Sequence, residues 1–168
     1  MTATIVLLSG APGSGKSTLA RALQAELGWP RVERDELYAG LMAGAGLTRG
    51  DVVPRGVELF WRMTAAYADA DCSVIADATL YRDQSEADVR TVLVPAGVVC
   101  NVHCRTDLAL GRFATRGHGA AMEARVRGNL PRVERPLDLG VPLLEVDTTD
   151  GHDPLLADVV RWVRAQNA

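Results

Sequence analysis

The sequence predicts an α/β fold, a three-layer α/β/α sandwich in which a five-stranded parallel sheet lies between two layers of helices. Short apolar stretches, suited to strands buried on both faces, alternate with longer stretches that show a helical repeat. This alternation is typical of parallel strands joined by helices. The first strand also runs directly into a glycine-rich loop and a helix. No repeat or linker divides the chain, so we expect a single domain over residues 1–168.

The glycine-rich loop follows the first predicted strand, residues 3–9, and matches G-x-x-x-x-G-K-[S/T]. Its glycines permit positive φ, so that successive backbone N–H groups can converge on phosphate oxygens, and the following helix N-terminus adds partial positive charge. We therefore predict a nucleotide-binding phosphate loop, in which Lys16 contacts the β- and γ-phosphates and Ser17 binds Mg²⁺. The residues assigned to the nucleotide here are Gly10, Ala11, Pro12, Gly13, Ser14, Gly15, Lys16, Ser17 and Thr18.

The first half of the chain continues with three predicted helices and one strand. Leucines recur at helical spacing up to residue 27, and Gly28 ends this helix. A short strand is expected at about 31–34 and a helix at about 36–45. After a glycine-rich loop, an amphipathic pattern predicts a longer helix at about 54–70.

The second half continues the alternation to the C-terminus. We expect strands at about 72–76, 98–104 and 143–146, and helices at about 83–94, 107–115, 120–133 and 154–165. Between the two middle helices, glycines on both sides of His118 mark a hinge. Roughly residues 112–130 are therefore expected to form a helical lid.

Composition limits the classes of partner and compartment. The net charge of −3 lacks the strongly basic balance typical of nucleic-acid-binding proteins, so we expect a small-molecule partner rather than nucleic acid. Three cysteines without a C-x-x-C pair favour the reducing cytoplasm. No signal peptide or membrane-spanning stretch is recognisable, so no membrane partner is expected. The protein is expected to be a monomer or a homodimer.

Two aspartates, Asp35 and Asp77, follow predicted strands at the edge of the sheet where ligands bind in such folds. Either one alone could be a simple helix N-cap. Beside a phosphate loop, however, phosphoryl transfer needs one group that accepts the proton of the attacking hydroxyl and a carboxylate that positions Mg²⁺. We expect the two aspartates to divide these tasks.

The transferred phosphate also needs cationic groups around its oxygens. Arg112 and Arg116 lie four residues apart on one helix face, directly before the predicted hinge. We expect both to close over the phosphates with the lid. Arg132 and Arg135, further along, are interpreted as solvated surface residues.

These motifs resemble, in the same order, those of P-loop kinases related to the kinase domain of phage polynucleotide kinase. Zeta toxins and chloramphenicol phosphotransferase are more distant relatives of the same group. The stretches that carry the resemblance are Gly10–Thr18, Glu33–Tyr38, Val74–Thr79, Arg112–Arg116 and Val146–Gly151. The resemblance implies a P-loop NTPase fold, ATP and Mg²⁺ as cofactors, and transfer of the γ-phosphoryl group to an alcohol.

The resemblance also implies roles for single residues. Asp35 would be the general base, and Arg116 would contact the transferred phosphate. Lys16 and Ser17 would be the phosphate and Mg²⁺ ligands, and a loop that contains Thr148, Thr149 and Gly151 would lie beside the adenine. From the residues themselves, we expect Asp77 to be a further metal ligand and Arg112 to lie along the nucleotide.

Acceptor specificity is expected in the two helices between residues 36 and 70, because they follow the base. The residues assigned to the acceptor are Arg34, Asp35, Tyr38, Met42, Trp61, Asp77, Thr79 and Arg82, with Glu58 and Arg62 nearby. Tyr38 stands where polynucleotide kinase carries an arginine for the phosphate of the nucleic-acid end, which argues against a polynucleotide acceptor.

The expected function is an ATP-dependent kinase that phosphorylates a hydroxyl of a small molecule such as an antibiotic, nucleoside, sugar or nucleotide sugar. The first alternative is a polynucleotide 5′-hydroxyl kinase. An alternative of another class is a nucleotide-dependent switch or binding ATPase, which would hydrolyse ATP slowly and signal by lid motion.

Overall fold

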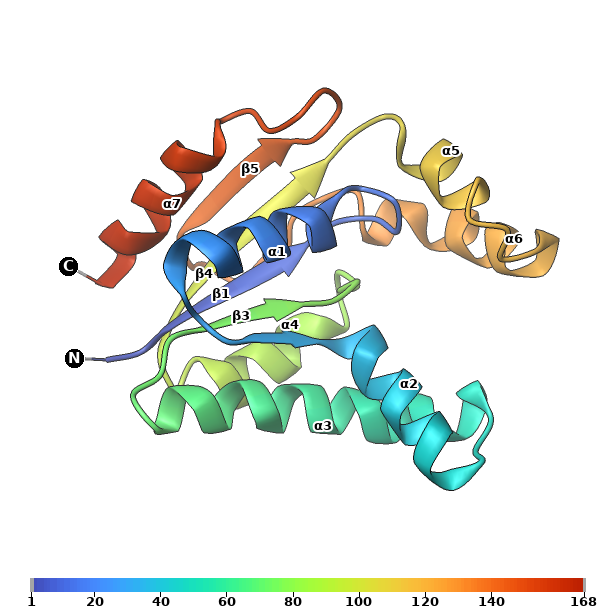
Figure 1. Ribbon diagram of the computed structural model, residues 1–168, viewed down its shortest axis with the longest axis horizontal. Helices are drawn as coiled ribbons and strands as arrows, with labels where there is room; N and C mark the ends of the chain where they lie inside the picture. The colour runs from blue at the N-terminus through green and yellow to red at the C-terminus, as the bar shows by residue number, and fades with distance from the viewer. Residues whose placement is uncertain (1, 168) are drawn as a thin grey trace.

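The computed structural model describes residues 2–167 and contains one five-stranded sheet in the order β2-β3-β1-β4-β5 (Figure 1). All strand pairs in this sheet are parallel. The strands are β1 (Thr4–Ser9), β2 (Arg31–Glu33), β3 (Val74–Asp77), β4 (Val98–Arg105) and β5 (Leu143–Asp147). The predicted five-stranded parallel sheet is therefore confirmed.

Helices cover both faces of the sheet, as the alternating pattern predicts (Figure 1). One face is covered by α1 (Lys16–Leu27) and α7 (Leu156–Arg164), and the other by α3 (Arg49–Asp69), α4 (Ser85–Asp88) and the π-helical turn η1 (Val89–Leu93). The remaining helical segments are α2 (Arg34–Ala45), α5 (Ala109–Ala114), α6 (Ala120–Asn129), η2 (Leu130–Arg132) and η3 (Ala165–Asn167). Three layers result, which confirms the predicted sandwich.

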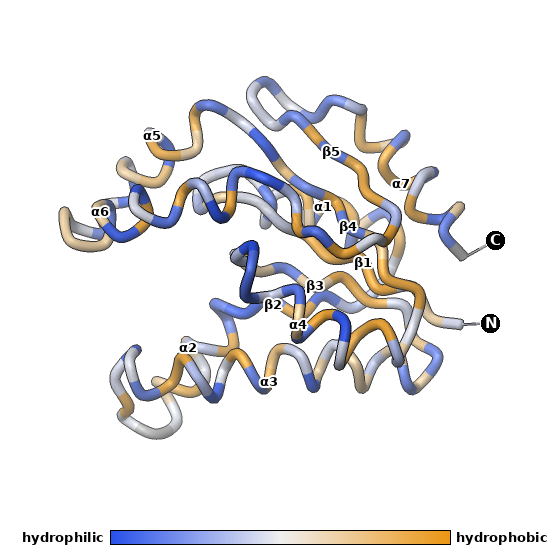
Figure 2. The backbone as a smooth tube through the Cα atoms, turned by 180° about the vertical axis from the view of Figure 1, so that it is seen from behind, coloured by the Kyte–Doolittle hydropathy of each residue, from blue (hydrophilic) through white to orange (hydrophobic). Residues whose placement is uncertain are grey.

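The central strand β1 explains why both faces need cover. Ile5 and Leu7 pack into the core beneath α3, whereas Val6 and Leu8 pack into the core beneath α1 and α7. Successive side chains of a strand point to opposite faces, so an uninterrupted apolar strand supplies two cores at once. Figure 2 shows this hydrophobic strand with its apolar neighbours in the middle of the molecule.

The predicted start of the long helix at residue 54 is wrong, because α3 begins five residues earlier, at Arg49. Thr48 and Asp51 form a capping box, in which each side chain bonds the backbone of the other residue. This cap satisfies the first backbone N–H groups of the helix. Pro54 therefore lies inside α3 rather than at its start.

Other helix boundaries also differ from the prediction. The helix expected at 83–94 has only one α-helical turn, α4, and continues as the π-helical turn η1. The helix expected at 120–133 ends at Asn129, where η2 tightens into a 3₁₀ turn that contains Pro131. Asp77 is the last residue of β3 rather than a residue after it. Within residues 2–167, none of the helices combines the length and the apolar character that crossing a membrane requires.

Candidate active site

The phosphate loop lies between β1 and α1, and its glycines are structurally required. Gly10 and Gly13 have φ of 136° and 86°. A Cβ at Gly10 would collide with the carbonyl oxygen of Cys104, and one at Gly13 with the carbonyl oxygen of Ala109. The loop is therefore packed closely against β4 and the start of α5, in a conformation that side chains would not allow.

Lys16, the first residue of α1, is buried at the end of the phosphate loop. Its side chain is buried and donates a hydrogen bond to the carbonyl oxygen of Ala11 at 3.3 Å. Burial lowers the pKa of Lys16, the charges of Asp77 and Asp35 oppose this shift, and the charge of Arg116 adds to it. Asp77 belongs to β3 and Asp35 to α2, whereas Arg116 lies in the turn after α5.

Asp77 presents a buried carboxylate beside the phosphate loop. Its side chain is 1% exposed, and its Oδ2 atom has no hydrogen-bond partner among the described residues. Burial raises the pKa of Asp77, while Lys16, a hydrogen bond from Ser17 and the charge of Arg31 lower it. Nη1 of Arg31 lies 3.7 Å from Oδ2 of Asp77.

This donor set fits Mg²⁺. A carboxylate oxygen without a hydrogen bond and a neighbouring serine hydroxyl are both hard oxygen ligands. The described residues contain no group of three or more His, Cys, Asp or Glu side chains placed to hold a metal by themselves. That is the arrangement in which Mg²⁺ takes its other ligands from substrate phosphates and water.

Asp35 differs from Asp77 in being open to solvent. It lies in the first turn of α2, and its side chain is 73% exposed. Oδ1 of Asp35 is 3.5 Å from Nη2 of Arg49, the first residue of α3. An incoming hydroxyl compound could therefore reach Asp35, while Asp77 is covered.

Tyr38 is fixed between the two helices that follow Asp35. Its side chain is buried against Gly56 of α3, where a Cβ would collide with the tyrosine ring. The guanidinium of Arg34 lies 6.0 Å from the ring centroid, and Arg34 also donates a hydrogen bond to the carbonyl oxygen of Thr79. Burial raises the pKa of Tyr38. Arg34 is thus in contact with both Tyr38 and Thr79, next to Asp35.

Other residues assigned to the acceptor lie elsewhere. Trp61 is buried in the hydrophobic core, in edge contact with Phe60 at 4.8 Å between ring centroids, so it does not line an open site. Glu58 and Arg62 pair with each other on an exposed surface, 3.4 Å apart. Their position about 200–240° around α3 from Gly56 places them on the opposite side of this helix.

Two further residues assigned to the acceptor, Met42 and Arg82, lie at the edge of the candidate site. Met42 is half-buried, one turn beyond Tyr38 in α2. Arg82 donates a hydrogen bond to the carbonyl oxygen of Pro136 at 3.0 Å and lies 3.8 Å from Asp138, so it is engaged by the segment that follows the lid.

Arg112 and Arg116, the two arginines predicted for the lid, have different surroundings. Arg112 donates hydrogen bonds to the carbonyl oxygens of Thr148 and Thr149, at 3.0 and 2.7 Å, and thereby holds the loop that follows β5. Arg116 is exposed in the turn that follows α5. Gly117 and Gly119, with φ of 70° and 87°, separate α5 from α6, at the predicted hinge.

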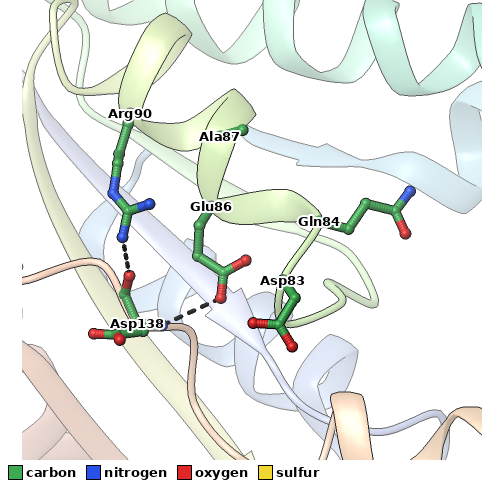
Figure 3. Close-up of a pocket in the computed structure, with 6 residues that line it drawn as sticks. All are labelled: Asp83, Gln84, Glu86, Ala87, Arg90 and Asp138. Atoms are coloured by element: carbon green, nitrogen blue, oxygen red, sulfur yellow. Dashed lines mark hydrogen bonds between the residues drawn. The ribbon is translucent and has the colours of Figure 1, made fainter.

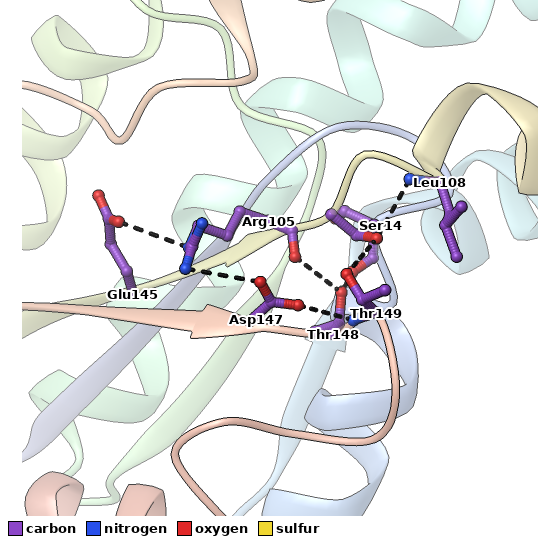
Figure 4. Close-up of polar contacts among 8 residues, drawn as sticks. Ser14, Arg105, Leu108, Glu145, Asp147, Thr148 and Thr149 are labelled. Carbon is purple, nitrogen blue, oxygen red and sulfur yellow. Dashed lines mark hydrogen bonds and ion pairs between the residues drawn. The ribbon is translucent and has the colours of Figure 1, made fainter.

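The loop after β5 also contacts the phosphate loop (Figure 4). The Thr148 hydroxyl donates a hydrogen bond to the carbonyl oxygen of Ser14 at 2.6 Å, and the hydroxyls of Thr149 and Thr106 are 2.9 Å apart. Gly151 completes the loop with φ of 91°. Beside it lies a cavity of about 460 Å³, lined by Ala11, Ser14, Cys104, Arg105, Thr106, Asp107, Ala109, Leu110, Leu130, Glu134, Asp147 and Thr149.

A second cavity, of about 250 Å³, lies beside α4 (Figure 3). It is lined by Asp83, Gln84, Glu86, Ala87, Arg90 and Asp138. Around it, Glu86 accepts a hydrogen bond from the backbone N–H of Asp138 at 3.3 Å, and Arg90 donates one to the carbonyl oxygen of Asp138. These contacts fasten the segment that leads from η2 back to β5. No motif in the sequence predicts this attachment.

Arg31 and Arg49 are site residues that sequence reasoning missed. Arg31 contacts Glu33, Glu36 and Asp77 with a side chain that is only 9% exposed. Glu33 pairs with Asp77 in the register of β2 and β3, and Arg31 lies two residues before Glu33. The two-residue period of a strand therefore places all three side chains on one face of the sheet. The role of Arg31 could have been predicted from the sequence if the pairing of β2 with β3 had been known.

The model of a family described as AAA domain matches residues 5–132. No curated protein matches the chain in sequence. A candidate kinase from Chloroflexus aurantiacus has a similar structure, with a TM-score of 0.82 and 24% identity over 98% of this chain and 95% of that one.

Two further kinases share the fold. For a sugar kinase from Janibacter the TM-score is 0.68, with 23% identity over 98% of this chain and 95% of that one. For the APS kinase of Mycobacterium tuberculosis, solved with AMPPNP and APS, the TM-score is 0.65, with 22% identity over 98% and 97%. The fold implied by the resemblance to P-loop kinases is thereby confirmed.

Proposed function

The chain belongs to the AAA domain family, and from this premise we propose that it is an ATP-dependent kinase that phosphorylates a hydroxyl group of a small molecule. The observation that carries the proposal is the phosphate loop between β1 and α1, with Lys16 buried at the start of α1 and the buried carboxylate of Asp77 at the end of the neighbouring strand β3. The charges of Asp77, Asp35 and Arg116 all act on this buried ammonium group. Phosphoryl transfer requires these kinds of group around one phosphate: a cation, a metal-positioning carboxylate, a base and a mobile arginine.

In this proposal the nucleotide binds along the carboxyl ends of β1, β4 and β5. Backbone N–H groups of the phosphate loop and the Lys16 ammonium bind the β- and γ-phosphates. The adenine lies beside the loop that contains Thr148 and Thr149, which Arg112 holds by two hydrogen bonds. The kinase neighbour solved with AMPPNP supports a nucleotide of this kind.

The two aspartates have separate tasks. Asp77 and the Ser17 hydroxyl hold Mg²⁺, which when bound supplies positive charge to the phosphate oxygens. Asp35, which is exposed, takes the proton of the acceptor hydroxyl. As the acceptor oxygen bonds to the γ-phosphorus, the bond from that phosphorus to the β–γ bridging oxygen breaks and ADP leaves. Arg116 neutralises charge on the phosphoryl group during this transfer.

A direct test measures ADP release from MgATP with a panel of hydroxylated compounds, and identifies the product by the added mass of one phosphoryl group. The panel includes sugars, sugar acids, nucleosides, aminoglycosides and an oligonucleotide with a free 5′-hydroxyl. We expect a small molecule to accelerate ADP release, and Lys16→Ala to abolish the acceleration. A product formed only from the oligonucleotide would favour the polynucleotide kinase. If ADP and free phosphate formed at a rate that no acceptor increases, a switch ATPase would be favoured.

A further inference from the structure

Two arginines gather around Tyr38, next to the proposed base, and phosphoryl transfer assigns them no role. The guanidinium of Arg49 lies 5.3 Å from the centroid of the Tyr38 ring, and that of Arg34 lies 6.0 Å from it. They come from the first residues of α3 and α2. We call Tyr38, Arg34 and Arg49 the Tyr38 platform.

The platform is rigid at its base. Tyr38 is 5% exposed, and its ring fills the space that Gly56 leaves open on α3. The guanidinium of Arg34 also lies 5.8 Å from the ring of the buried Phe60. A cation–π contact with a fixed ring favours positions of the guanidinium near that ring, so the N–H groups of both arginines stay close to Tyr38.

The charges of the platform are not balanced. The platform has two guanidiniums, and its ion pair is that of Arg49 with Asp35, a long contact of 3.5 Å. The side chain of Arg49 is still 51% exposed. Arginine has five N–H donors, so most of those of Arg49 remain available to a ligand.

We propose that the acceptor carries an anionic group, a carboxylate or a phosphate, which binds Arg49 at the Tyr38 platform while the reacting hydroxyl lies at Asp35. This rests on the proposed kinase function. The planar fork of a guanidinium fits both kinds of anion by two parallel hydrogen bonds. A bound anion would also take over the donors that Arg49 now directs to Asp35, which leaves that carboxylate free to accept the proton.

The competing explanation is that Arg49 and Asp35 form an ordinary exposed ion pair, which contributes little. The same helix supplies the matched control. Arg62 pairs with Glu58 at 3.4 Å, with side chains 74% and 69% exposed, on the side of α3 away from Tyr38. If ion pairing alone were responsible, loss of Arg62 and loss of Arg49 would have the same effect.

The experiment measures binding by calorimetry to the protein saturated with AMPPNP and Mg²⁺. Three pairs of ligands differ mainly in charge: gluconate and glucitol, glucuronate and glucose, ribose 5-phosphate and ribose. We expect an anionic member to bind at least about tenfold more tightly than its neutral partner, the effect of one charge-assisted hydrogen bond. Arg49→Gln should remove most of this preference, and Arg62→Gln should keep it.

Equal affinities within all three pairs, or a preference that survives in Arg49→Gln, would overturn the anion site. Preference for a sugar acid or for the sugar phosphate distinguishes a carboxylate from a phosphate. ADP release with the same compounds separates the two proposals. Charge-selective binding without phosphoryl transfer would contradict the kinase function alone, whereas transfer to neutral acceptors without charge preference would contradict the anion site alone.

Discussion

Thr148 and Ser14 are 134 residues apart in the chain, and the Thr148 hydroxyl donates a hydrogen bond to the Ser14 carbonyl oxygen at 2.6 Å. This bond joins the loop that follows the last strand to the phosphate loop. Both residues are buried, so water could not easily replace the Thr148 hydroxyl as hydrogen-bond donor, and loss of this bond would cost free energy of unfolding.

Thr148→Val should therefore weaken both the fold and nucleotide binding. Valine keeps the shape but leaves the Ser14 carbonyl oxygen without this donor, at an expected cost of about 1–2 kcal/mol in the free energy of unfolding. Urea unfolding and AMPPNP titration measure the two effects. Thr91→Val is the control, because the Thr91 hydroxyl bonds an exposed helical carbonyl of Ala87. Equal behaviour of the two variants would contradict a role for Thr148 in the phosphate loop.

Lys16 is the only lysine of the 168 residues, which allows its amine to be followed selectively. Burial lowers the pKa of Lys16, so its uncharged, nucleophilic form appears at a lower pH than that of a free lysine side chain. We expect a small acylating reagent to label Lys16 with a pH midpoint below that of Nα-acetyl-lysine, whose ε-amine is free. MgATP should protect Lys16 from this labelling. Peptide mapping separates this label from the N-terminal amine, and Lys16→Arg removes it. Labelling with the midpoint of free lysine, unaffected by MgATP, would contradict the site.

Asp35→Asn should reduce kcat by about 10²–10⁴-fold and barely change the affinity for ATP, because the base acts on the acceptor. Asp77→Asn should instead change the dependence of activity on Mg²⁺ concentration. Steady-state kinetics at varied ATP, acceptor and Mg²⁺ distinguish the two variants, with Glu58→Gln as an exposed control. If Asp77→Asn left the Mg²⁺ dependence unchanged and lowered kcat by the same factor, the two roles would have to be exchanged.

Arg116→Lys tests the lid. Lysine keeps the charge but loses the planar fork, so kcat should fall far more than nucleotide affinity, since the contact strengthens mainly in the transition state. Arg135→Lys serves as the control, because Arg135 is an exposed arginine expected to belong to the solvated surface. A kcat of Arg116→Lys within about twofold of the parent, less than ~1 kcal/mol in the barrier, would return Arg116 to the solvated surface.

His103 should make stability depend on pH. Its buried ring donates from Nε2 to the carbonyl oxygen of Glu134 at 3.0 Å, and Nδ1 lies 2.9 Å from the hydroxyl of Ser9, just before the phosphate loop. Burial lowers the pKa of His103, so the unfolded chain binds a proton that the folded protein resists. The free energy of unfolding contributed by this group is therefore complete above about pH 6.5 and declines as the pH falls below it.

The His103→Gln variant isolates this contribution from those of other titrating groups. Urea unfolding of both proteins between about pH 5 and 8 gives the two profiles, and the parent should lose more stability than the variant on acidification, by at most about 1.4 kcal/mol per pH unit. Parallel profiles would show that His103 does not titrate differently in the two states.

Sequence alone determined the features that depend on local pattern. An uninterrupted apolar strand, a glycine-rich loop and a helix are adjacent in the chain, so their order predicted the phosphate loop around Lys16. The period of side chains in strands and helices predicted the parallel sheet. The rule that ligands lie at the carboxyl ends of parallel strands then selected Asp35 and Asp77.

The tertiary structure alone decided which distant side chains meet. Arg49 and Asp35 lie on two helices whose approach depends on Gly56 accommodating Tyr38, a contact that no local pattern encodes. The local capping box of Thr48 and Asp51 sets where α3 begins, but only the packing of α2 against α3 brings Arg49, its first residue, to Asp35. The amphipathic pattern of α3 is compatible with Trp61 in a pocket or in the core, and in the structure it is buried in the core. The physical reason is that periodicity specifies which face of an element is apolar, whereas the partner of that face depends on packing between elements.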